Sequence, residues 1–255
     1  MQPFKRGNTD MDPAGRHALV TGGGSGIGAA IVDALRAAGA VVTVLGRRSG
    51  SDPFYQQADV TDAASVRAAI DRAEAAHGPI AILVNNAGAA ETAPFGRLTR
   101  DMWDRMLAVN LTAVFEVTQA VLPAMTKRGW GRVINIASTA GLTGYPYVAA
   151  YVAAKHGVVG LTRALALEVA KSAVTVNALC PGYTETRLLT NSFATIMAKT
   201  GKTEAEVRRD FTKGNPQGRL VQPDEVAAAV LWLCRPGSDA MTGQAIAISG
   251  GEVLH

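Results

Sequence analysis

The sequence contains little cysteine, few aromatic residues and few charged residues, and each shortage narrows the class of protein. Its 255 residues include two cysteines, 5% aromatic residues and 18% charged residues, with a formal net charge of +4. Cys180 and Cys234 both follow apolar residues, which favours buried free thiols over a disulfide scaffold. No stretch approaches the ~20 apolar residues of a membrane span. No basic stripe interleaved with aromatic residues points to nucleic acid.

The first 14 residues are polar and contain Gly, Asn, Asp and Pro, which predicts a flexible N-terminal extension over 1–14. They lack the apolar run of a signal peptide or a membrane anchor. We therefore expect a cytoplasmic protein that binds neither a membrane nor nucleic acid. Its mild positive charge suits small ligands that carry several phosphates.

Short apolar runs rich in β-branched residues recur along the rest of the chain. Strands are predicted at 18–21, 41–45, 82–85, 133–137, 174–179 and 245–248, and a weaker run at 55–58 predicts a seventh strand. Between them, apolar residues share single helix faces, as Ile27, Ile31 and Leu35 do. Such alternation builds right-handed βαβ units. The pattern predicts one Rossmann-type α/β domain over 15–255, a doubly wound parallel seven-stranded sheet with helices on both faces.

The first predicted strand runs into a glycine-rich turn from Thr21 to Gly28, and a helix follows. Glycines permit a tight turn and a close approach of the backbone to a pyrophosphate. The free N–H groups at the helix N-terminus attract the same anion. A glycine-rich run alone also fits a plain loop, but the flanking strand and helix favour a dinucleotide site. No Lys-Ser/Thr pair follows the last glycine, which excludes an NTPase phosphate loop.

The end of the second predicted strand bears on the choice of cofactor. NAD-binding folds place an Asp or Glu there to bind the ribose 2′-hydroxyl, whereas this sequence has Arg47 and Arg48. Arginine pairs bidentately with phosphate, so the pair favours the 2′-phosphate of NADP. The alternatives are two simply solvated arginines and NAD as the cofactor.

A candidate catalytic set follows the fifth predicted strand. Ser138 ends that strand, and Tyr151 and Lys155 stand four residues apart in a helical segment, so their polar groups can share one helix face. A tyrosine pKa of about 10 is too high for proton transfer at neutral pH, and a nearby ammonium is expected to lower it. Ser138 can then hydrogen-bond the substrate oxygen. Asn110, in a helical run, can pin a kink or a water that relays protons from Lys155.

Each of these patterns has an ordinary explanation when it is taken alone. Tyr-x-x-x-Lys pairs arise often by chance, and serines at strand ends are common. Their joint occurrence with the glycine turn is what indicates hydride transfer to or from a carbonyl carbon. A nucleotide-sensing protein without turnover is the remote alternative, because such a protein would be free to lose Tyr151 or Lys155.

Six motifs, in their order and spacing, resemble the short-chain dehydrogenase/reductase family over essentially the whole chain from residue 16 onward. They are Thr21-Gly-x-x-x-Gly-x-Gly28, Asn85-Asn86-Ala87-Gly88, Asn110, Ser138, Tyr151-x-x-x-Lys155 and Pro181-Gly182. The resemblance implies that Tyr151 is the acid/base and that Lys155 also binds the nicotinamide ribose. It further implies that Ser138 orients the substrate carbonyl and that Asn110 completes a proton relay.

The resemblance also implies a cofactor-binding set. Residues 86–88 would line the adenosine side of the cleft, 59–60 would flank the adenine, and 181–182 with 186 would pack around the nicotinamide amide. The full set is Gly22, Ser25, Gly26, Ile27, Gly28, Arg47, Arg48, Asp59, Val60, Asn86, Ala87, Gly88, Tyr151, Lys155, Pro181, Gly182 and Thr186. Two departures stand out: Ser25 replaces an arginine common in NADP enzymes, and the second and third strands lack the usual helix between them. The NADP preference thus depends on Arg47 and Arg48.

The stretch 183–218 is polar, and we expect it to form a substrate lid. Leu188, Leu189, Phe193, Ile196 and Met197 could close an acyl pocket or simply pack as a helix. Its basic residues, Lys199, Lys202, Arg208, Arg209 and Lys213, could meet the phosphates of coenzyme A or an acidic carrier protein, or form a solvated face.

The segments 215–220 and 223–226 resemble 3-oxoacyl thioester reductases and 3-hydroxyacyl-CoA dehydrogenases of this family. We therefore expect a 3-oxoacyl or 3-hydroxyacyl thioester substrate, linked to coenzyme A or a carrier protein. A small free ketone, sugar or cyclic alcohol is the alternative. The histidines show no metal-ligand spacing, so no metal is expected. Two long helices with apolar residues on more than one face, together with the resemblance, suggest a homotetramer.

Overall fold

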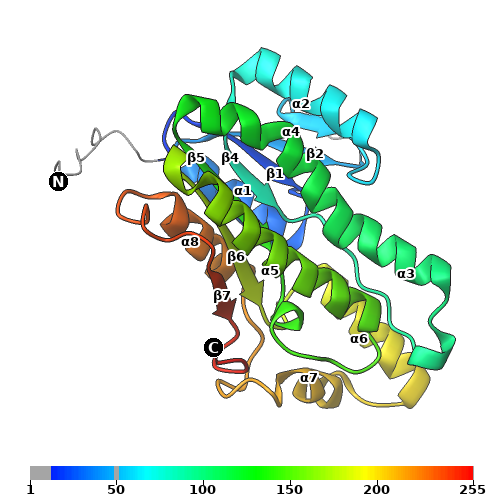
Figure 1. The fold of residues 1–255 in the computed structure, drawn as a ribbon. Coiled ribbons are helices and arrows are strands. Elements are labelled where there is room, and N and C mark those ends of the chain that lie inside the picture. Colours follow the sequence, from blue (N-terminus) through cyan, green and yellow to red (C-terminus); the bar gives the residue numbers. More distant parts are fainter. Residues whose placement is uncertain (1–12, 49–51, 255) are drawn as a thin grey trace.

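A parallel sheet of seven strands forms the centre of the computed structural model, which describes residues 13–48 and 52–254 (Figure 1). The predicted extension over 1–14 therefore lies outside the described residues, apart from Pro13 and Ala14. The strand order is β3-β2-β1-β4-β5-β6-β7. Their bounds are β1 His17–Thr21, β2 Val41–Gly46, β3 Tyr55–Gln57, β4 Ile80–Asn85, β5 Gly131–Ile136, β6 Val174–Pro181 and β7 Ala245–Ile248.

Helices cover both faces of this sheet, as Figure 1 shows. One face packs against α1 Gly26–Ala37 and α8 Pro223–Cys234. The other packs against α2 Ala63–His77, α4 Ala113–Arg128 and α5 Ala149–Val169. Fully buried Val, Ile and Leu side chains fill the strands between the two layers, as expected where both faces of a parallel sheet are covered. The predicted doubly wound α/β fold is confirmed.

All seven predicted strands are present, and the main differences lie at their ends. β5 begins at Gly131, two residues before the predicted apolar run, and so includes the charged Arg132. The Arg132 side chain is fully buried, with its guanidinium 4.5 Å from the Trp130 ring centroid and 2.5 Å from Asp239. An ion pair and an aromatic face thus let a charged residue enter a buried strand, which an apolar pattern does not anticipate.

The strand order reverses at β1, which pairs with β2 on one side and β4 on the other. The connection from β1 to β2 passes through α1 on one face of the sheet, and the connection from β3 to β4 passes through α2 on the other. Such a switch point opens a crevice at the carboxyl ends of β1 and β4. β5 and β6 end at the same edge. The predicted site residues after these strands are consequently gathered at one edge.

The longest helical run, Arg100–Arg128, is long and apolar enough to cross a membrane by length and composition alone. It comprises α3 Arg100–Leu107, a π-helical turn Ala108–Thr112 and α4. Within the fold, 44% of its apolar window is buried, and α4 covers the sheet. A core helix passes the same test, so the expectation that no membrane is bound stays a prediction.

The predicted lid region contains two helices, α6 Arg187–Thr200 and α7 Glu204–Thr212. Phe193, Val207 and Leu220 form a small core between them, with Leu189, Ile196, Met197 and Phe211 packed around it. This is the ordinary helix packing named as the alternative to an acyl pocket; the Leu188 side chain lies outside the described residues.

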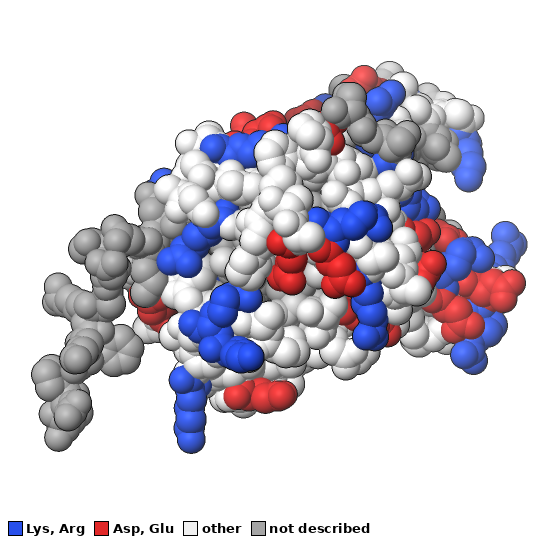
Figure 2. All heavy atoms as spheres, turned by 90° about the horizontal axis from the view of Figure 1, so that it is seen from above, with Lys and Arg blue, Asp and Glu red and all other residues white. Residues whose placement is uncertain are grey.

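On the face drawn in Figure 2, basic and acidic side chains are interspersed, with no continuous patch of one sign.

Candidate active site

The glycine turn after β1 folds as the sequence predicts. Gly22 and Gly26 have φ angles of +66° and +54°, which favour glycine. A Cβ on Gly28 would collide with the Gly22 carbonyl and lie 2.5 Å from the Asn86 side-chain nitrogen. Ser25 is the N-cap residue of α1, but its side chain makes no capping hydrogen bond. The N–H groups of the first helical turn therefore remain uncapped. The turn therefore offers open backbone donors to an anion.

The turn is fastened to the end of β4. The Asn86 amide nitrogen donates to the Thr21 carbonyl at 2.9 Å and to the Gly22 carbonyl at 3.2 Å. The backbone N–H groups of Asn86 and Ala87 both donate to the Thr21 hydroxyl, at 2.9 and 3.0 Å. These bonds join the two strand ends on either side of the crevice, so the motif Asn85-Asn86-Ala87-Gly88 and the glycine turn form one rigid edge.

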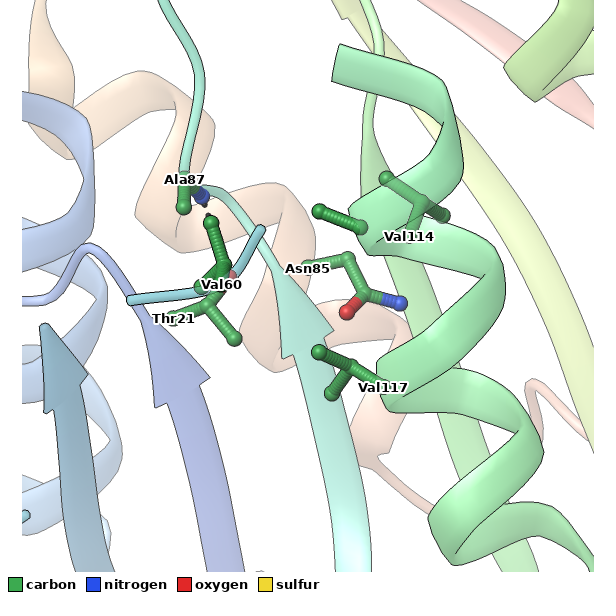
Figure 3. A pocket seen from close by; sticks show the side chains of 7 residues that line it. Thr21, Val60, Asn85, Ala87, Val114 and Val117 are labelled. Carbon is green, nitrogen blue, oxygen red and sulfur yellow. Dashed lines mark hydrogen bonds between the residues drawn. The ribbon is translucent and has the colours of Figure 1, made fainter. Parts of the chain in front are cut away.

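A narrow pocket lies beside this edge, lined by Thr21, Val60, Asn85, Ala87, Ala113, Val114 and Val117 (Figure 3). Asn85 donates to Thr118 and to Asn135, each at 2.9 Å, while its buried amide oxygen has no partner among the described residues. Val60, predicted to flank an adenine, thus stands on the pocket wall. An unpartnered buried acceptor beside the crevice fits a bound polar ligand better than a sealed core.

Arg47, which follows β2, borders a second, more open hollow of about 430 Å³, whose other lining residues are Gln57, Ala58, Asp59 and Ser65. Arg48 points toward the glycine turn, with its guanidinium 3.4 Å from the Gly24 carbonyl. Hydrogen bonds from Thr61, aided by the charge of Arg47, lower the pKa of Asp59. No helix separates β2 from β3 among the described residues 47–48 and 52–54, so both arginines stay exposed at this end.

Tyr151 and Lys155 lie one turn apart on α5, as the i/i+4 spacing predicts. The Lys155 ammonium is 5.6 Å from the Tyr151 ring centroid and donates to the Ile136 carbonyl at 2.9 Å. Ser138 stands beside Tyr151, and its hydroxyl accepts a hydrogen bond from the Ala140 N–H at 3.1 Å. Lys155 is buried and has no carboxylate partner in the described chain. The structure therefore brings the three predicted groups together at the carboxyl ends of β5 and β6.

The electrostatics of this set differ from the expectation. Burial raises the pKa of Tyr151, and the neighbouring Ser138 hydroxyl offsets only part of that rise. Burial also lowers the pKa of Lys155 to about 8. The expected lowering of the tyrosine pKa by Lys155 is thus wrong for this structure, because the ammonium is itself desolvated and faces a backbone carbonyl. The phenol form of Tyr151 is favoured.

Asn110 occupies the π-helical turn between α3 and α4 and is fully buried. Its side-chain nitrogen donates to the carbonyls of Ala89 and Met106, at 2.8 and 3.0 Å, and its oxygen accepts from the Ala89 N–H at 3.3 Å. These bonds pin the helix irregularity, as predicted. A Cβ on Gly88 would lie 2.9 Å from the Asn110 oxygen and 3.9 Å from the Lys155 nitrogen, so both groups converge beside Gly88.

The residues predicted to surround a nicotinamide lie across the crevice from the glycine turn. A Cβ on Gly26 would lie 3.2 Å from the Thr186 side chain, and Thr186 begins α6. Pro181 ends β6 next to Gly182, on the same edge as Ser138. Ile27, by contrast, packs partly into the core against α8. The turn, the strand ends and the start of α6 therefore form the two sides of one cleft.

Sequence reasoning missed one group at this site, a polar wall beyond Ser138. The Tyr145 hydroxyl lies 2.9 Å from the Thr139 hydroxyl and 2.7 Å from Glu252. Tyr183 contacts Tyr145 edge to face, with centroids 6.1 Å apart. The only sequence signal was the glycine pair at 250–251, which marks a special backbone conformation just before Glu252.

These residues fit a nicotinamide dinucleotide. The glycine turn can hold a pyrophosphate because the N–H groups of the first turn of α1 have no side-chain cap, and Arg47 with Arg48 can receive a 2′-phosphate. Lys155, Asn110 and Ser138 meet at the other end of the cleft. No group of three or more His, Cys, Asp or Glu residues within the described chain could hold a metal ion.

Comparisons with known proteins agree on one family. The family model for short chain dehydrogenases matches residues 16–196. An acetoacetyl-CoA reductase of Rhizobium meliloti is 39% identical, over 93% of this chain and 98% of its own. A D-beta-hydroxybutyrate dehydrogenase of Cupriavidus necator is 37% identical, over 94% and 99%. The crystal structure of an actinorhodin polyketide ketoreductase variant with NADPH is similar with a TM-score of 0.88 and 37% identity, over 94% and 98%.

Proposed function

Because the chain belongs to the short-chain dehydrogenase family, we propose that it interconverts the ketone of 3-oxoacyl thioesters and the secondary alcohol of 3-hydroxyacyl thioesters with NADP(H). The observation that carries this proposal is the convergence of Ser138, Tyr151 and Lys155 at the sheet edge, beside the glycine turn. An oxidoreductase needs both parts, a cradle for the dinucleotide and an acid/base at the reacting carbon.

The residues of the site divide the chemistry among them. A bound nicotinamide would supply or accept the hydride. Tyr151, held as a phenol by its raised pKa, donates its proton to the carbonyl oxygen as negative charge develops there. The Ser138 hydroxyl hydrogen-bonds the same oxygen and orients it. Lys155 would hold the nicotinamide ribose, and its ammonium, which converges with Asn110 beside Gly88, would return a proton to Tyr151 through water.

NADP is favoured over NAD by the end of β2. The hollow beside Arg47 offers room for an adenosine ribose and its 2′-phosphate, and Arg48 stands between this hollow and the glycine turn. No carboxylate ends β2 to bind a 2′-hydroxyl. The remaining cofactor residues of the predicted set, from Gly22 to Thr186, belong to the same proposed cleft.

The thioester is favoured by the relatives and by the segment after α7. Relatives are named acetoacetyl-CoA reductase and putative polyketide ketoacyl reductase. A free 3-hydroxy acid is the second candidate, because another relative is named D-beta-hydroxybutyrate dehydrogenase. We also propose that the enzyme works in the cytoplasm as a homotetramer, supported by the exposed apolar residues on α4 and α5.

The test is a panel of acetoacetyl-CoA, longer 3-oxoacyl thioesters and simple ketones, each with NADH and NADPH, for the wild type and Tyr151→Phe. We expect NADPH-dependent reduction of the thioesters, and a loss of about 10²–10⁴-fold in Tyr151→Phe. NADPH binding, followed by fluorescence, should persist because the phenol oxygen alone is removed. Equal turnover by the variant would refute the mechanism. Binding without turnover by the wild type would favour a nucleotide sensor.

A further inference from the structure

The chain after β7 brings a carboxylate to the polar wall of the site. Gly250 and Gly251 have φ angles of +61° and +92°, which side chains rarely adopt. A Cβ on Gly250 would collide with Asn215, and one on Gly251 would lie 3.3 Å from Pro216. Glycine is therefore required at both positions. The pair directs the chain so that the next residue, Glu252, faces the site.

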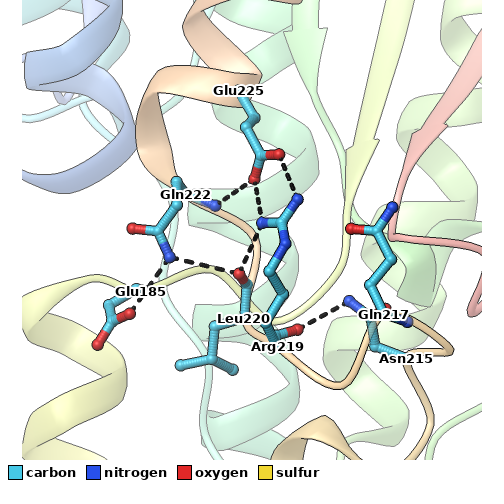
Figure 4. Close-up of polar contacts among 7 residues, drawn as sticks. All are labelled: Glu185, Asn215, Gln217, Arg219, Leu220, Gln222 and Glu225. Carbon is cyan, nitrogen blue, oxygen red and sulfur yellow. Dashed lines mark hydrogen bonds and ion pairs between the residues drawn. The ribbon is translucent and has the colours of Figure 1, made fainter.

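The loop beneath this glycine pair is itself held firmly, as Figure 4 shows. Asn215 donates to the Arg219 carbonyl and accepts from the Gln217 N–H, each at 2.8 Å. Arg219 forms two bonds to Glu225 at the start of α8, at 2.7 and 2.6 Å. The hydrogen-bonded loop 215–219 thus fixes the glycine pair that positions Glu252.

The Glu252 carboxylate forms no ion pair with a cationic side chain among the described residues. One carboxylate oxygen accepts from the Tyr145 hydroxyl at 2.7 Å, and the other would lie 2.9 Å from a Cβ on Gly182. The carboxylate therefore projects a negative field into its surroundings.

The Glu252 carboxylate lies beside the predicted nicotinamide end of the cleft. Gly182 belongs to the predicted nicotinamide end, and the Thr139 hydroxyl bonded to Tyr145 follows Ser138 directly. Tyr183 lies against the same wall: burial raises its pKa, and the charge of Glu252 adds to that rise. Tyr183 is 40% exposed, so a substrate arm can reach this wall.

We propose that Glu252 selects the charge of the substrate, excluding 3-oxo acids with a free carboxylate and admitting neutral esters and thioesters. The inference rests on the proposed function. In a 3-oxo acid the carboxylate lies two bonds from the reacting carbon, so it would approach the Glu252 carboxylate beside Gly182. Repulsion of two unit charges at a few ångströms, reduced by partial exposure, disfavours the acid by about tenfold or more.

The test compares acetoacetate with ethyl acetoacetate, which share the reacting carbonyl and differ in charge, using NADPH and Glu252→Gln. Glutamine still accepts from Tyr145, so the wall is kept and only the charge is lost. We expect kcat/KM for acetoacetate to rise about tenfold, and that for the ester to change less than about twofold. Glu168→Gln, an exposed carboxylate on α5, is the matched control and should change neither.

Two further readouts separate the outcomes. Raising the ionic strength should lower the ratio of kcat/KM for the ester to kcat/KM for the acid in the wild type. This measurement does not depend on the folding of any variant. Tyr145→Phe removes the bond to Glu252 but keeps its charge, so the ratio should persist. An unchanged ratio in Glu252→Gln and at high salt would overturn the inference while leaving the proposed function intact. Failure of the wild type to reduce the ester and acetoacetyl-CoA would overturn both.

Discussion

The raised pKa of Tyr151 decides which direction of the reaction depends on pH. Oxidation of an alcohol by NADP releases a proton, so the ratio of the two directions must change about tenfold per pH unit. Reduction needs the phenol, which is fully populated at neutral pH because burial raises the pKa of Tyr151. Oxidation needs the phenolate, whose fraction rises with pH until that pKa is reached.

We therefore expect kcat/KM for ketone reduction to stay flat between pH 6 and about 8, the pKa of Lys155, and to decline above it as the ammonium is lost. Alcohol oxidation should rise about tenfold per unit over the same interval. Initial rates in both directions from pH 6 to 9 provide the measurement. A reduction rate that already falls from pH 6 upward would mean that the bound cofactor lowers the tyrosine pKa below neutrality.

The cofactor preference can be tested at the two arginines after β2. Arg47 lines the hollow of about 430 Å³, and Arg48 faces the Gly24 carbonyl. Replacing either by Ala removes a cation from the proposed 2′-phosphate site, so KM for NADPH should rise about tenfold while KM for NADH stays unchanged. Lys127→Ala is the control, because it removes an exposed charge near the C-terminal end of α4. Equal effects on both cofactors would argue against a 2′-phosphate site.

Several of the site residues that the sequence predicted follow strands directly. Parallel strands all present their carboxyl ends at one edge, so Ser138, Asn86 and Gly182 could be placed together before any coordinates were known. The pKa of Tyr151 could not be predicted from the sequence. It depends on burial and on the hydrogen bond that the Lys155 ammonium donates to the Ile136 carbonyl. The contact of Tyr145 with Glu252 joins residues 107 positions apart, which local patterns do not encode.

Among the elements, strands were predicted better than helix irregularities. Apolar runs rich in Val, Ile and Leu identified six of the strands, and β3 followed from a weaker run at 55–58. β5 differed at its start because a buried ion pair allows Arg132 into it. The π-helical turn at 108–112 was anticipated only as a kink at Asn110, since its extra residue per turn depends on the Asn110 bonds to Ala89 and Met106. Likewise, the apolar residues of α6 fitted both a pocket and helix packing until α7 was seen to cover Phe193.

The lid helices carry the proposed contact with a thioester carrier, and their ion pairs show which cations are free for it. Lys202 pairs with Asp210 at 2.6 Å and Arg208 with Glu185 at 2.7 Å. Lys199, Arg209 and Lys213 are exposed and form no ion pair within the described residues. These three, rather than all five basic residues, are therefore available to the phosphates of coenzyme A.

Replacing Lys199, Arg209 and Lys213 together by Gln should raise KM for acetoacetyl-CoA about tenfold and leave KM for ethyl acetoacetate unchanged, because the ester has no phosphates. Raising the salt concentration should produce the same difference in the wild type. Lys202→Gln serves as a control, since its charge is already neutralised by Asp210. Unchanged kinetics with acetoacetyl-CoA would end the idea that the lid binds the carrier.

At the scale of the whole molecule, the outer face of α4 and α5 offers the strongest argument for assembly. These neighbouring helices each connect consecutive parallel strands, so they run in the same direction. Phe115, near the start of α4, is 42% exposed, and Leu167, near the end of α5, is 82% exposed. A twofold axis through this face would set the start of one helix pair against the end of the other, covering both side chains in a self-complementary contact.

Phe115→Glu and Leu167→Glu should therefore reduce the proposed homotetramer to a smaller species, because each buries a charge in an apolar contact. Sedimentation velocity over a range of protein concentrations measures the change. Phe95→Glu is a comparison variant, because Phe95 is 79% exposed and lies in the short turn before α3 rather than on α4 or α5. If the Phe115 and Leu167 variants sediment as the wild type does, α4 and α5 do not form the interface. If the Phe95 variant alone dissociates, the interface includes the turn before α3 instead.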